Sequence, residues 1–305
     1  MAMKIAIVGG LGFIGTNLYF KLNKTYKIKI IDNFKVKNNI CFIDKKKIIR
    51  CDIKNSKKLK NILINFDVII NLAGQTGVIE SNDKPHECLS DNIFGYLNIL
   101  HSANSSNKKI KIINASTAGA IYGDTKKICS ETAEMNPISY YGLSKKFNEE
   151  QSNIFNKLYN LKIVNLRFAN VYGEFSLHKK SLVHNSIKSY IKRKKMFIFG
   201  NGNQTRDFIY VGDLVEIIER SIKFKTGSYN IASGKSNSVN DFINILKNNS
   251  YCPNYIKVKR NKGEIKDVKI NNKKLLNEIN DSNFKFTSFE QGIKNTLMWY
   301  RKYFS

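Results

Sequence analysis

The stretch Lys4–Gly15, KIAIVGGLGFIG, decides the fold class. Its first residues, Lys4–Val8, are almost all aliphatic and predict a buried strand, and a helical pattern follows the glycines. The glycines have a GxxGxxG spacing: Gly9 permits a tight turn, Gly12 lets the backbone approach a pyrophosphate, and Gly15 lets the helix pack closely on the strand. The stretch therefore predicts a dinucleotide site, with a purely structural glycine turn as the alternative.

Alternating strand and helix patterns continue through the first half of the chain, which is typical of a parallel sheet covered by helices. The further strands predicted there are Lys27–Ile31, Lys47–Arg50, Val68–Leu72, Lys111–Ala115 and Lys162–Leu166. The predicted helices are Ile14–Leu22, Asn92–Ser102 and Tyr141–Tyr159. Beyond about Gly173 the rhythm changes to helices over Leu182–Lys194, Asp213–Ser221 and Val239–Leu246 and a strand over Met196–Gly200.

We therefore predict an α/β fold with two parts. Residues 1–172 form a Rossmann-type, doubly wound parallel sheet that binds the dinucleotide, and part of 207–233 returns to it. Residues 173–305 form a smaller α/β lobe for the substrate. Because the chain has only three prolines and no low-complexity linker, the two parts are expected to pack together without a flexible hinge.

The composition excludes a disordered chain. Of the 305 residues 42% are apolar, which is enough for a full core, although the net charge is +27. Only seven of the 51 basic residues are arginines, whereas surfaces that read nucleic acid usually use arginine for its planar fork. We therefore expect lysine-covered, solvated faces and no nucleic-acid partner.

Cysteines and hydrophobic runs indicate a cytoplasmic protein. The five cysteines are odd in number and have no metal-like spacing, which predicts a reduced protein with neither a disulfide framework nor a metal site. No apolar run approaches the roughly 20 residues that cross a bilayer. We therefore expect no membrane association.

Polar residues at the ends of the next strands fit the rest of a dinucleotide. Asp32 ends the second strand, where a carboxylate accepts hydrogen bonds from the adenosine ribose hydroxyls and repels a 2′-phosphate. NAD is therefore favoured over NADP, although Lys35 and Lys37 soften that preference. Asp52 follows the third strand and is placed to meet the adenine, unless it is an ordinary surface residue. The small residues of Asn71–Gly74 leave room for the cofactor.

The pentad Tyr141–Lys145, YGLSK, carries the most chemical information. Residues i and i+4 of a helix share one face, so the Lys145 ammonium is expected to lower the pKa of the Tyr141 phenol towards the working pH. A tyrosine with a pKa of about 10 is a poor base at neutral pH, but beside a fixed cation it can exchange a proton with a sugar hydroxyl. In a chain with 15 tyrosines this spacing also arises by chance, so other motifs must support it.

Further motifs follow one another along the chain. They are GGLGFIG (Gly9–Gly15), CDI (Cys51–Ile53), NLAG (Asn71–Gly74), DNIFGYLNIL (Asp91–Leu100), STAGAIYG (Ser116–Gly123), YYGLSK (Tyr140–Lys145), LRFANVYG (Leu166–Gly173), GNGNQTRDFIYVGDL (Gly200–Leu214) and NIASGKSNSV (Asn230–Val239). Together, and in this order, they resemble the extended short-chain dehydrogenase/reductase family over nearly the whole chain. The chain is similar to its NAD-dependent nucleotide-sugar epimerases and dehydratases of the UDP-galactose 4-epimerase type.

The resemblance implies roles for particular residues. Around NAD it places Gly9, Gly12, Phe13, Ile14, Gly15, Asp32, Asn33, Asp52, Ile53, Leu72, Ala73, Gly74 and Asn92, together with the catalytic pair Tyr141 and Lys145. At the substrate phosphates it places Asn170, Arg206 and Arg260. A guanidinium fork can grip paired phosphate oxygens. Surface salt bridging is the alternative for the two arginines.

One position departs from the family pattern. Where the family usually has a catalytic Ser or Thr, this chain has Ala118. Thr117 and Ser116 lie just before it, and Gly119 could let the loop shift so that Thr117, or else Ser116, supplies the hydroxyl. Damaged catalysis is the alternative.

The residues after this position narrow the reaction. Related dehydratases and decarboxylases carry an acid there, because eliminating water needs a separate acid and base, whereas this chain has Gly119 and Ala120. We therefore expect epimerisation at C4 of a UDP-sugar through a transient keto sugar. The alternatives are a keto-sugar reductase or dehydrogenase with exchangeable NAD(P)H, and a C2 epimerase of a CDP-sugar, whose relatives the stretch Ala73–Pro85 resembles. A non-catalytic NAD sensor or nucleic-acid-binding protein is the remaining hypothesis.

Two of the predicted helices, Asn92–Ser102 and Tyr141–Tyr159, carry apolar stripes. In the family these helices build a dimeric four-helix bundle, so the resemblance implies a homodimer. Ordinary burial against the sheet is the alternative.

Overall fold

Seven parallel strands form the central sheet. The structure is a computed structural model that describes residues 2–35, 39–192, 194–249, 251, 254–259 and 268–304. The strands are β1 (Lys4–Val8), β2 (Lys27–Asp32), β3 (Ile48–Arg50), β4 (Val68–Asn71), β5 (Lys111–Thr117), β7 (Lys162–Phe168) and β11 (Gly227–Ile231). Their order across the sheet is β11-β7-β5-β4-β1-β2-β3, and every neighbouring pair is parallel. The predicted α/β class with a Rossmann-type, doubly wound sheet is confirmed.

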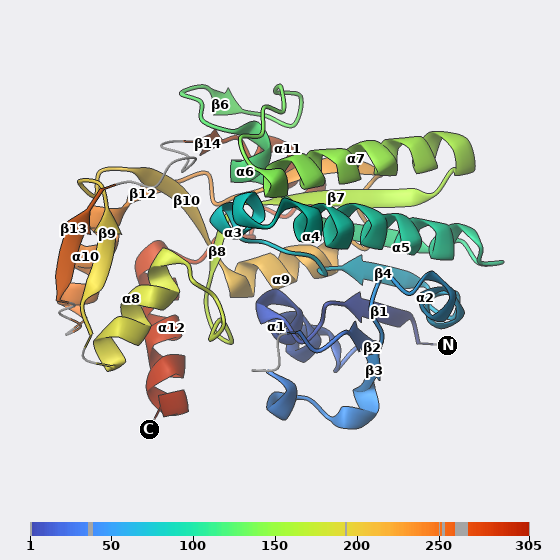
Figure 1. Cartoon of the computed structure of the whole chain (residues 1–305), viewed down its shortest axis with the longest axis horizontal. Helices are drawn as coiled ribbons and strands as arrows, with labels where there is room; N and C mark the ends of the chain where they lie inside the picture. Colours follow the sequence, from blue (N-terminus) through green and yellow to red (C-terminus); the bar gives the residue numbers. More distant parts are fainter. Residues whose placement is uncertain are drawn as a thin grey trace.

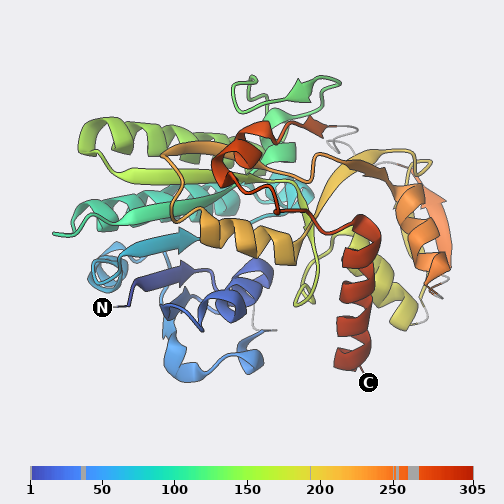
Figure 2. The same cartoon turned by 180° about the vertical axis from the view of Figure 1, so that it is seen from behind.

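Helices cover both faces of this sheet (Figures 1 and 2). One layer contains α1 (Phe13–Leu22) and α9 (Val211–Arg220), and the other contains α2 (Ser56–Leu63), α5 (Gly95–Asn104) and α7 (Tyr140–Tyr159). Residues of β1 alternate between the two cores: Ile5 and Ile7 face the α1 side, and Ala6 and Val8 face the α5 side. All four are fully buried, which explains why the strand is apolar throughout.

The C-terminal lobe lies beside one end of the central sheet (Figure 1). Its strands are β8 (Asn170–Tyr172), β9 (Met196–Phe199), β10 (Thr205–Tyr210), β12 (Ser236–Ser238) and β13 (Tyr255–Val258). Its helices are α8 (Leu182–Ile191), α10 (Val239–Asn248) and α12 (Phe289–Phe304). A separate apolar core around Phe242, Ile293 and Tyr300 holds these helices together. Between β10 and β12 the chain crosses back to the central sheet, where α9 packs on α1 and β11 pairs with β7.

Shorter elements complete the fold. They are η1 (Ile40–Phe42), η2 (Lys45–Lys47), α3 (Val78–Asp83), α4 (Pro85–Leu89), the π-helical turn η3 (Ser90–Phe94), α6 (Ala118–Tyr122), β6 (Ile128–Cys129), β14 (Lys269–Ile270) and α11 (Lys273–Ile279). The helix predicted from Asn92 therefore begins as a π turn. The helix predicted over Leu182–Lys194 ends at Ile191, and the one predicted from Asp213 begins at Val211.

A buried ion pair joins the longest helix to the sheet. The Arg167 guanidinium on β7 donates from Nη2 to Glu149 Oε2 of α7 over 2.7 Å and from Nε to Oε1 over 3.0 Å. The two side chains are only 4% and 3% exposed. Ser116 and Ser228 donate to the same carboxylate over 2.6 and 2.7 Å, and Arg167 Nη1 donates to the Tyr122 hydroxyl over 2.6 Å. The pair raises the pKa of Arg167 above its ordinary value.

Removing one partner of this pair should be strongly destabilising. We expect Arg167→Met to lower the free energy of unfolding by about 3–5 kcal/mol, because the Glu149 carboxylate then stays buried without its cation. Urea denaturation at pH 7 measures the loss. Lys294→Met is the control, since its pair with Glu290 is half exposed, and it should change the value by less than about 1 kcal/mol. Equal effects of the two substitutions would contradict the prediction.

Candidate active site

The predicted site residues of the first half gather at the carboxyl edge of the central sheet. Gly9 follows β1, Asp32 ends β2, Leu72 follows β4 and Thr117 ends β5. The carboxyl ends of parallel strands meet at one edge of a sheet, and open α/β sheets bind their ligands there.

The glycine turn leaves one open approach to the backbone. Gly9 has a φ of +77°, and a Cβ there would lie 2.7 Å from the Ala73 nitrogen. A Cβ on Gly15 would lie 2.5 Å from the Gly10 Cα, so both positions need glycine for packing. Gly12 differs: it is the N-cap of α1, and a Cβ on it would meet only the Gly9 carbonyl, at 3.3 Å. A pyrophosphate can therefore approach the start of α1 at Gly12.

The residues at the ends of β2 and β3 form a polar group on the adenosine side of this turn. Asp32 Oδ2 accepts the Leu11 N–H over 3.0 Å, and Oδ1 accepts the Phe34 N–H over 2.8 Å. Burial raises the pKa of Asp32, and the backbone donors partly offset that rise. The Asn33 amide donates to Asp52 Oδ2 over 3.0 Å. The carboxylate and amide atoms that would meet the ribose and adenine of a dinucleotide are thus side by side.

Lys35 and Lys54 are both held by Asp91, a residue the sequence analysis missed. Their ammonium groups lie 2.7 and 2.8 Å from the Asp91 carboxylate, and these contacts hold the pKa of Asp91 below its usual value despite partial burial. Lys35 therefore has a partner within the protein, and Lys37 lies outside the described residues. No spacing in the sequence pointed to Asp91, because its two partners follow different strands.

Asn92 fastens the loop after β4 to helix α7. Its Oδ1 accepts the Gln75 N–H over 2.8 Å, and its Nδ2 donates to Ser144 Oγ over 2.9 Å and to the Gln75 carbonyl over 3.1 Å. Gly74 has a φ of +139°, and a Cβ there would lie 2.6 Å from Asn92 Oδ1. Ile53 packs against Gly95 nearby. In this arrangement Asn92 shapes the floor of the site through the protein's own hydrogen bonds.

The reaction centre brings Tyr141, Lys145 and Thr117 together. The Thr117 side chain lies beside the Tyr141 hydroxyl and favours its charged form, but burial raises the pKa of Tyr141 to about 12 all the same. Lys145 is 4% exposed, and its ammonium donates to the Ala115 carbonyl over 2.8 Å. Burial lowers the pKa of Lys145 to about 8. The expected lowering of the Tyr141 pKa by Lys145 is therefore wrong for this structure, because desolvation dominates and the ammonium is directed at a carbonyl.

The two candidate hydroxyls point to different partners. Thr117 faces Tyr141, whereas Ser116 donates to Glu149 and is 2% exposed. Neighbouring residues of a strand point to opposite sides, so one strand places one hydroxyl at the reaction centre and the other in the buried ion pair. Ala118, which opens α6, is fully buried.

Two serines that the sequence analysis did not select position the tyrosine helix. The Ser81 hydroxyl accepts the Tyr141 N–H over 3.0 Å. Ser144 donates to the Tyr141 carbonyl over 2.7 Å while accepting from Asn92. Ser144 stands inside the YGLSK pentad, so its helical spacing from Tyr141 was a usable signal. Ser81 had none.

Two of the predicted phosphate ligands lie on adjacent strands of the C-terminal lobe. Asn170 on β8 is the register partner of Phe208 on β10, the strand that carries Arg206. The Asn170 amide donates to the Asp207 carbonyl over 3.2 Å, and Arg206 Nη1 donates to the Thr205 carbonyl over 2.8 Å. Arg260 lies outside the described residues. Across the gap between the lobes, the Lys179 ammonium donates to Thr76 Oγ1 over 2.9 Å.

Comparison with known proteins identifies the family. The model of the NAD dependent epimerase/dehydratase family matches residues 5–232. The chain belongs to this family. A putative UDP-glucose 4-epimerase of Methanocaldococcus jannaschii is 36% identical over 250 residues, which cover 80% of this chain and 81% of that protein.

Solved structures of this family are similar over nearly their whole length. One is UDP-glucose 4-epimerase of Thermotoga maritima, solved with UDP-glucose. It is 28% identical with a TM-score of 0.91, and the match covers 99% of this chain and 100% of that chain. UDP-N-acetylglucosamine 4-epimerase of Methanobrevibacter ruminantium M1, in complex with UDP-N-acetylmuramic acid, has a TM-score of 0.89 at 26% identity, with 99% of both chains covered. The family resemblance and the NAD cofactor predicted from the sequence are confirmed. Within the described ranges, none of the helices is long and apolar enough to cross a membrane.

Removing each of the two hydroxyls of β5 should affect a different property: one activity, the other stability. We expect Thr117→Val to lower kcat at least about tenfold, because the Tyr141 phenol then loses the neighbouring hydroxyl that favours its charged form, while the fold is kept. Ser116→Ala should instead lower the free energy of unfolding by about 1–3 kcal/mol, because it removes a donor from a buried carboxylate. Steady-state kinetics and urea denaturation of both variants test this. A larger loss of kcat in Ser116→Ala than in Thr117→Val would reverse the assignment.

Proposed function

We propose that this protein is an NAD-dependent epimerase of UDP-sugars that inverts C4 through a transient keto sugar. The observation that carries the proposal is that Thr117 lies beside the Tyr141 hydroxyl, with Lys145 one helical turn away, at the carboxyl edge of a sheet whose glycine turn admits a pyrophosphate. Membership of the family and the similarity to UDP-sugar 4-epimerases support it.

Bound NAD supplies the hydride acceptor and returns the hydride, so it is not consumed. The residues fit the cofactor: the backbone at Gly12 would hold the pyrophosphate, Asp32 the adenosine ribose, and Asn33 with Asp52 the adenine side. Lys145 is placed to bind the second ribose and to hold positive charge beside Tyr141. The chain thus provides binding, orientation and charge, while the cofactor provides the redox chemistry.

Tyr141 moves the proton in this mechanism. Its phenol oxygen accepts the proton of the sugar hydroxyl as the carbon loses hydride, and gives it back when hydride returns to the opposite face. A phenol with a pKa of about 12 is almost wholly protonated at neutral pH and cannot accept a proton, so the complex must bring positive charge to it to favour the phenolate. Lys145 can do this once its ammonium turns from the Ala115 carbonyl. Thr117 holds the phenol hydroxyl in position throughout.

Residues of the C-terminal lobe would bind the diphosphate of the substrate. Arg206 and Asn170 stand on adjacent strands and would contact the phosphates, with Arg260 as the further candidate. A diphosphate offers paired oxygens that a guanidinium can grip. Solved relatives hold UDP-glucose and UDP-N-acetylmuramic acid, and another, from Bacillus cereus, holds UDP-glucuronic acid with NAD. The sugar itself therefore has to be found by assay.

The proposed function is tested with purified protein and a panel of sugar nucleotides. We expect NAD in the supernatant after denaturation, and interconversion of C4 epimers of a UDP-hexose, UDP-N-acetylhexosamine or UDP-uronic acid without net absorbance change at 340 nm. Tyr141→Phe should lower kcat about 100- to 10,000-fold while retaining NAD, because only the proton transfer is lost.

Other outcomes identify the alternatives. A stoichiometric change at 340 nm indicates a keto-sugar reductase or dehydrogenase, and turnover of CDP-sugars alone indicates the C2 epimerase. Full activity of Tyr141→Phe, or turnover of no sugar nucleotide at all, would refute the proposed mechanism.

We further propose that the enzyme is a homodimer whose subunits pair through α7. Leu143, Phe147, Ile154 and Leu158 are 45%, 49%, 52% and 68% exposed and follow one another on one face of the helix. Phe94, on the neighbouring π turn, is 62% exposed. Exposed Glu150 lies on the same face, between Phe147 and Ile154. The four apolar side chains around it still mark an interaction surface, and a second copy would cover it with the same residues.

Negative charges introduced on the apolar face of α7 should separate the subunits. We expect Phe147→Glu combined with Leu158→Glu to give a monomer in light scattering coupled to size-exclusion chromatography, because the paired faces would bury four carboxylates. Ile256→Glu combined with Met298→Glu is the control. These residues are 40% and 67% exposed outside α7, and the change should leave the dimer intact. A monomeric unmodified protein would refute the dimer.

A further inference from the structure

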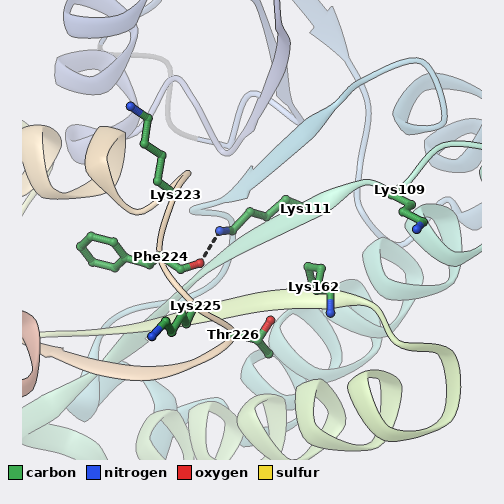
Figure 3. A pocket seen from close by; sticks show the side chains of 7 residues that line it. All are labelled: Lys109, Lys111, Lys162, Lys223, Phe224, Lys225 and Thr226. Carbon is green, nitrogen blue, oxygen red and sulfur yellow. Dashed lines mark hydrogen bonds between the residues drawn. The ribbon is translucent and has the colours of Figure 1, made fainter. Parts of the chain in front are cut away.

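A hollow lined by lysines lies at the amino edge of the central sheet, opposite the candidate active site. We call it the lysine hollow. It is lined by Lys109, Lys111, Lys162, Lys223, Phe224, Lys225 and Thr226 and has a volume of about 470 Å³. Lys109 and Lys111 come from the start of β5, Lys162 from the start of β7, and the rest from the loop between α9 and β11. Figure 3 shows the other lysines spread around Lys111.

The charges of the lysine hollow are not balanced within it. None of the seven described residues that line it is acidic. Lys111 and Lys162 are direct register partners on adjacent strands, and like charges in such positions repel each other. The Lys162 ammonium donates only to the neutral Asn160 side chain, over 3.0 Å. Lys109, Lys162, Lys223 and Lys225 are exposed to solvent, and the mutual repulsion of these charges falls when an anion joins them.

Lys111 is the lysine of this cluster whose ammonium is most removed from water. Its half-buried ammonium donates to the Phe224 carbonyl over 2.5 Å, as Figure 3 shows. Burial lowers the pKa of Lys111, and the attraction of Glu278 only partly offsets this. A backbone carbonyl is a neutral partner. The ammonium group is therefore desolvated without a carboxylate in contact.

Two carboxylates near the lysine hollow, Glu278 and Asp67, accept hydrogen bonds from backbone N–H groups, and Glu278 also attracts the Lys111 ammonium. Glu278 on α11 accepts the Lys225 N–H over 2.8 Å. Asp67, at the start of β4, accepts the Lys4 N–H over 2.8 Å and lies 3.4 Å from the Lys108 ammonium. These two carboxylates are fewer than the five lysines of the hollow, so most of its positive charge is left to solvent ions or a ligand.

We propose that the lysine hollow binds a small polyanion with two or three clustered phosphate groups. A phosphate carries about −1.5 to −2 charges at neutral pH, so two or three of them match five lysines. The volume falls in the range of about 300–1,000 Å³ typical of small-ligand sites. Lysine ammonium groups on flexible stems can turn towards phosphate oxygens without a fixed geometry. The site is separate from the sugar-nucleotide site, because it occupies the other edge of the sheet.

Inorganic tripolyphosphate is the probe, and the full chain is titrated with it by calorimetry. Saturating UDP is present throughout to block the phosphate contacts of the proposed active site. We expect one tripolyphosphate per chain, with an affinity that falls as salt is raised. Lys109→Gln combined with Lys223→Gln should weaken it at least about fivefold. Lys247→Gln combined with Lys257→Gln in the C-terminal lobe removes the same net charge and should change the affinity less than twofold.

Three results would overturn the proposal. They are the absence of saturable binding, equal weakening by both pairs of substitutions, and tighter, equally variant-sensitive binding of a 20-nucleotide single strand, which would make the surface one for nucleic acid. Epimerase activity of the Lys109→Gln/Lys223→Gln variant should stay unchanged. If the protein is an active epimerase but does not bind tripolyphosphate, the lysine hollow alone is refuted as a binding site and the proposed function stands.

Discussion

The fold and the candidate active site both depend on one buried carboxylate, that of Glu149. It stands four residues after Lys145 and eight after Tyr141, so all three share a side of α7. Donors from three strands reach it: Ser116 on β5, Arg167 on β7 and Ser228 on β11. A desolvated charge tolerates no loss of partners. Helix α7 is therefore fixed in rotation and depth against the sheet, and its tyrosine and lysine with it.

A ladder of buried amides fixes the register of the strands against which α7 packs. Asn71, Asn114 and Asn165 are register partners on β4, β5 and β7, and each amide donates to the next over 2.9 and 3.0 Å. Ser152 of α7 donates to the last of them over 3.1 Å. Buried amides need partners, and a shift of one residue would leave all three unpaired. The ladder thus fixes how far the end of β5, with Thr117, projects beside Tyr141.

Patterns within single segments were enough to predict the sheet and to point to the candidate reaction centre. The apolar runs gave the first-half strands to within two residues, and the glycine spacing and YGLSK marked the two ends of the site. What the sequence could not give depends on contacts between distant segments. Ser116 and Thr117 look equivalent in sequence, and only Glu149 and Tyr141 separate them. The three-residue strands β8 and β12 likewise carry too little pattern and exist through their pairing with β10, whose own apolar pattern is broken by Arg206 and Asp207.

The net charge of +27 cannot by itself decide where a ligand binds. Its field attracts any anion, but salt screens it beyond about 8 Å at physiological ionic strength. Discrimination must come from contacts within that distance. At the carboxyl edge, Asp32, Asp52 and Asp91 stand among the cations, and two lysines are already paired with Asp91. Such a mixture suits a ligand that presents hydroxyl donors as well as phosphates. The lysine hollow has no acid among the described residues that line it, so it offers a hydroxyl donor no carboxylate acceptor and suits phosphates better.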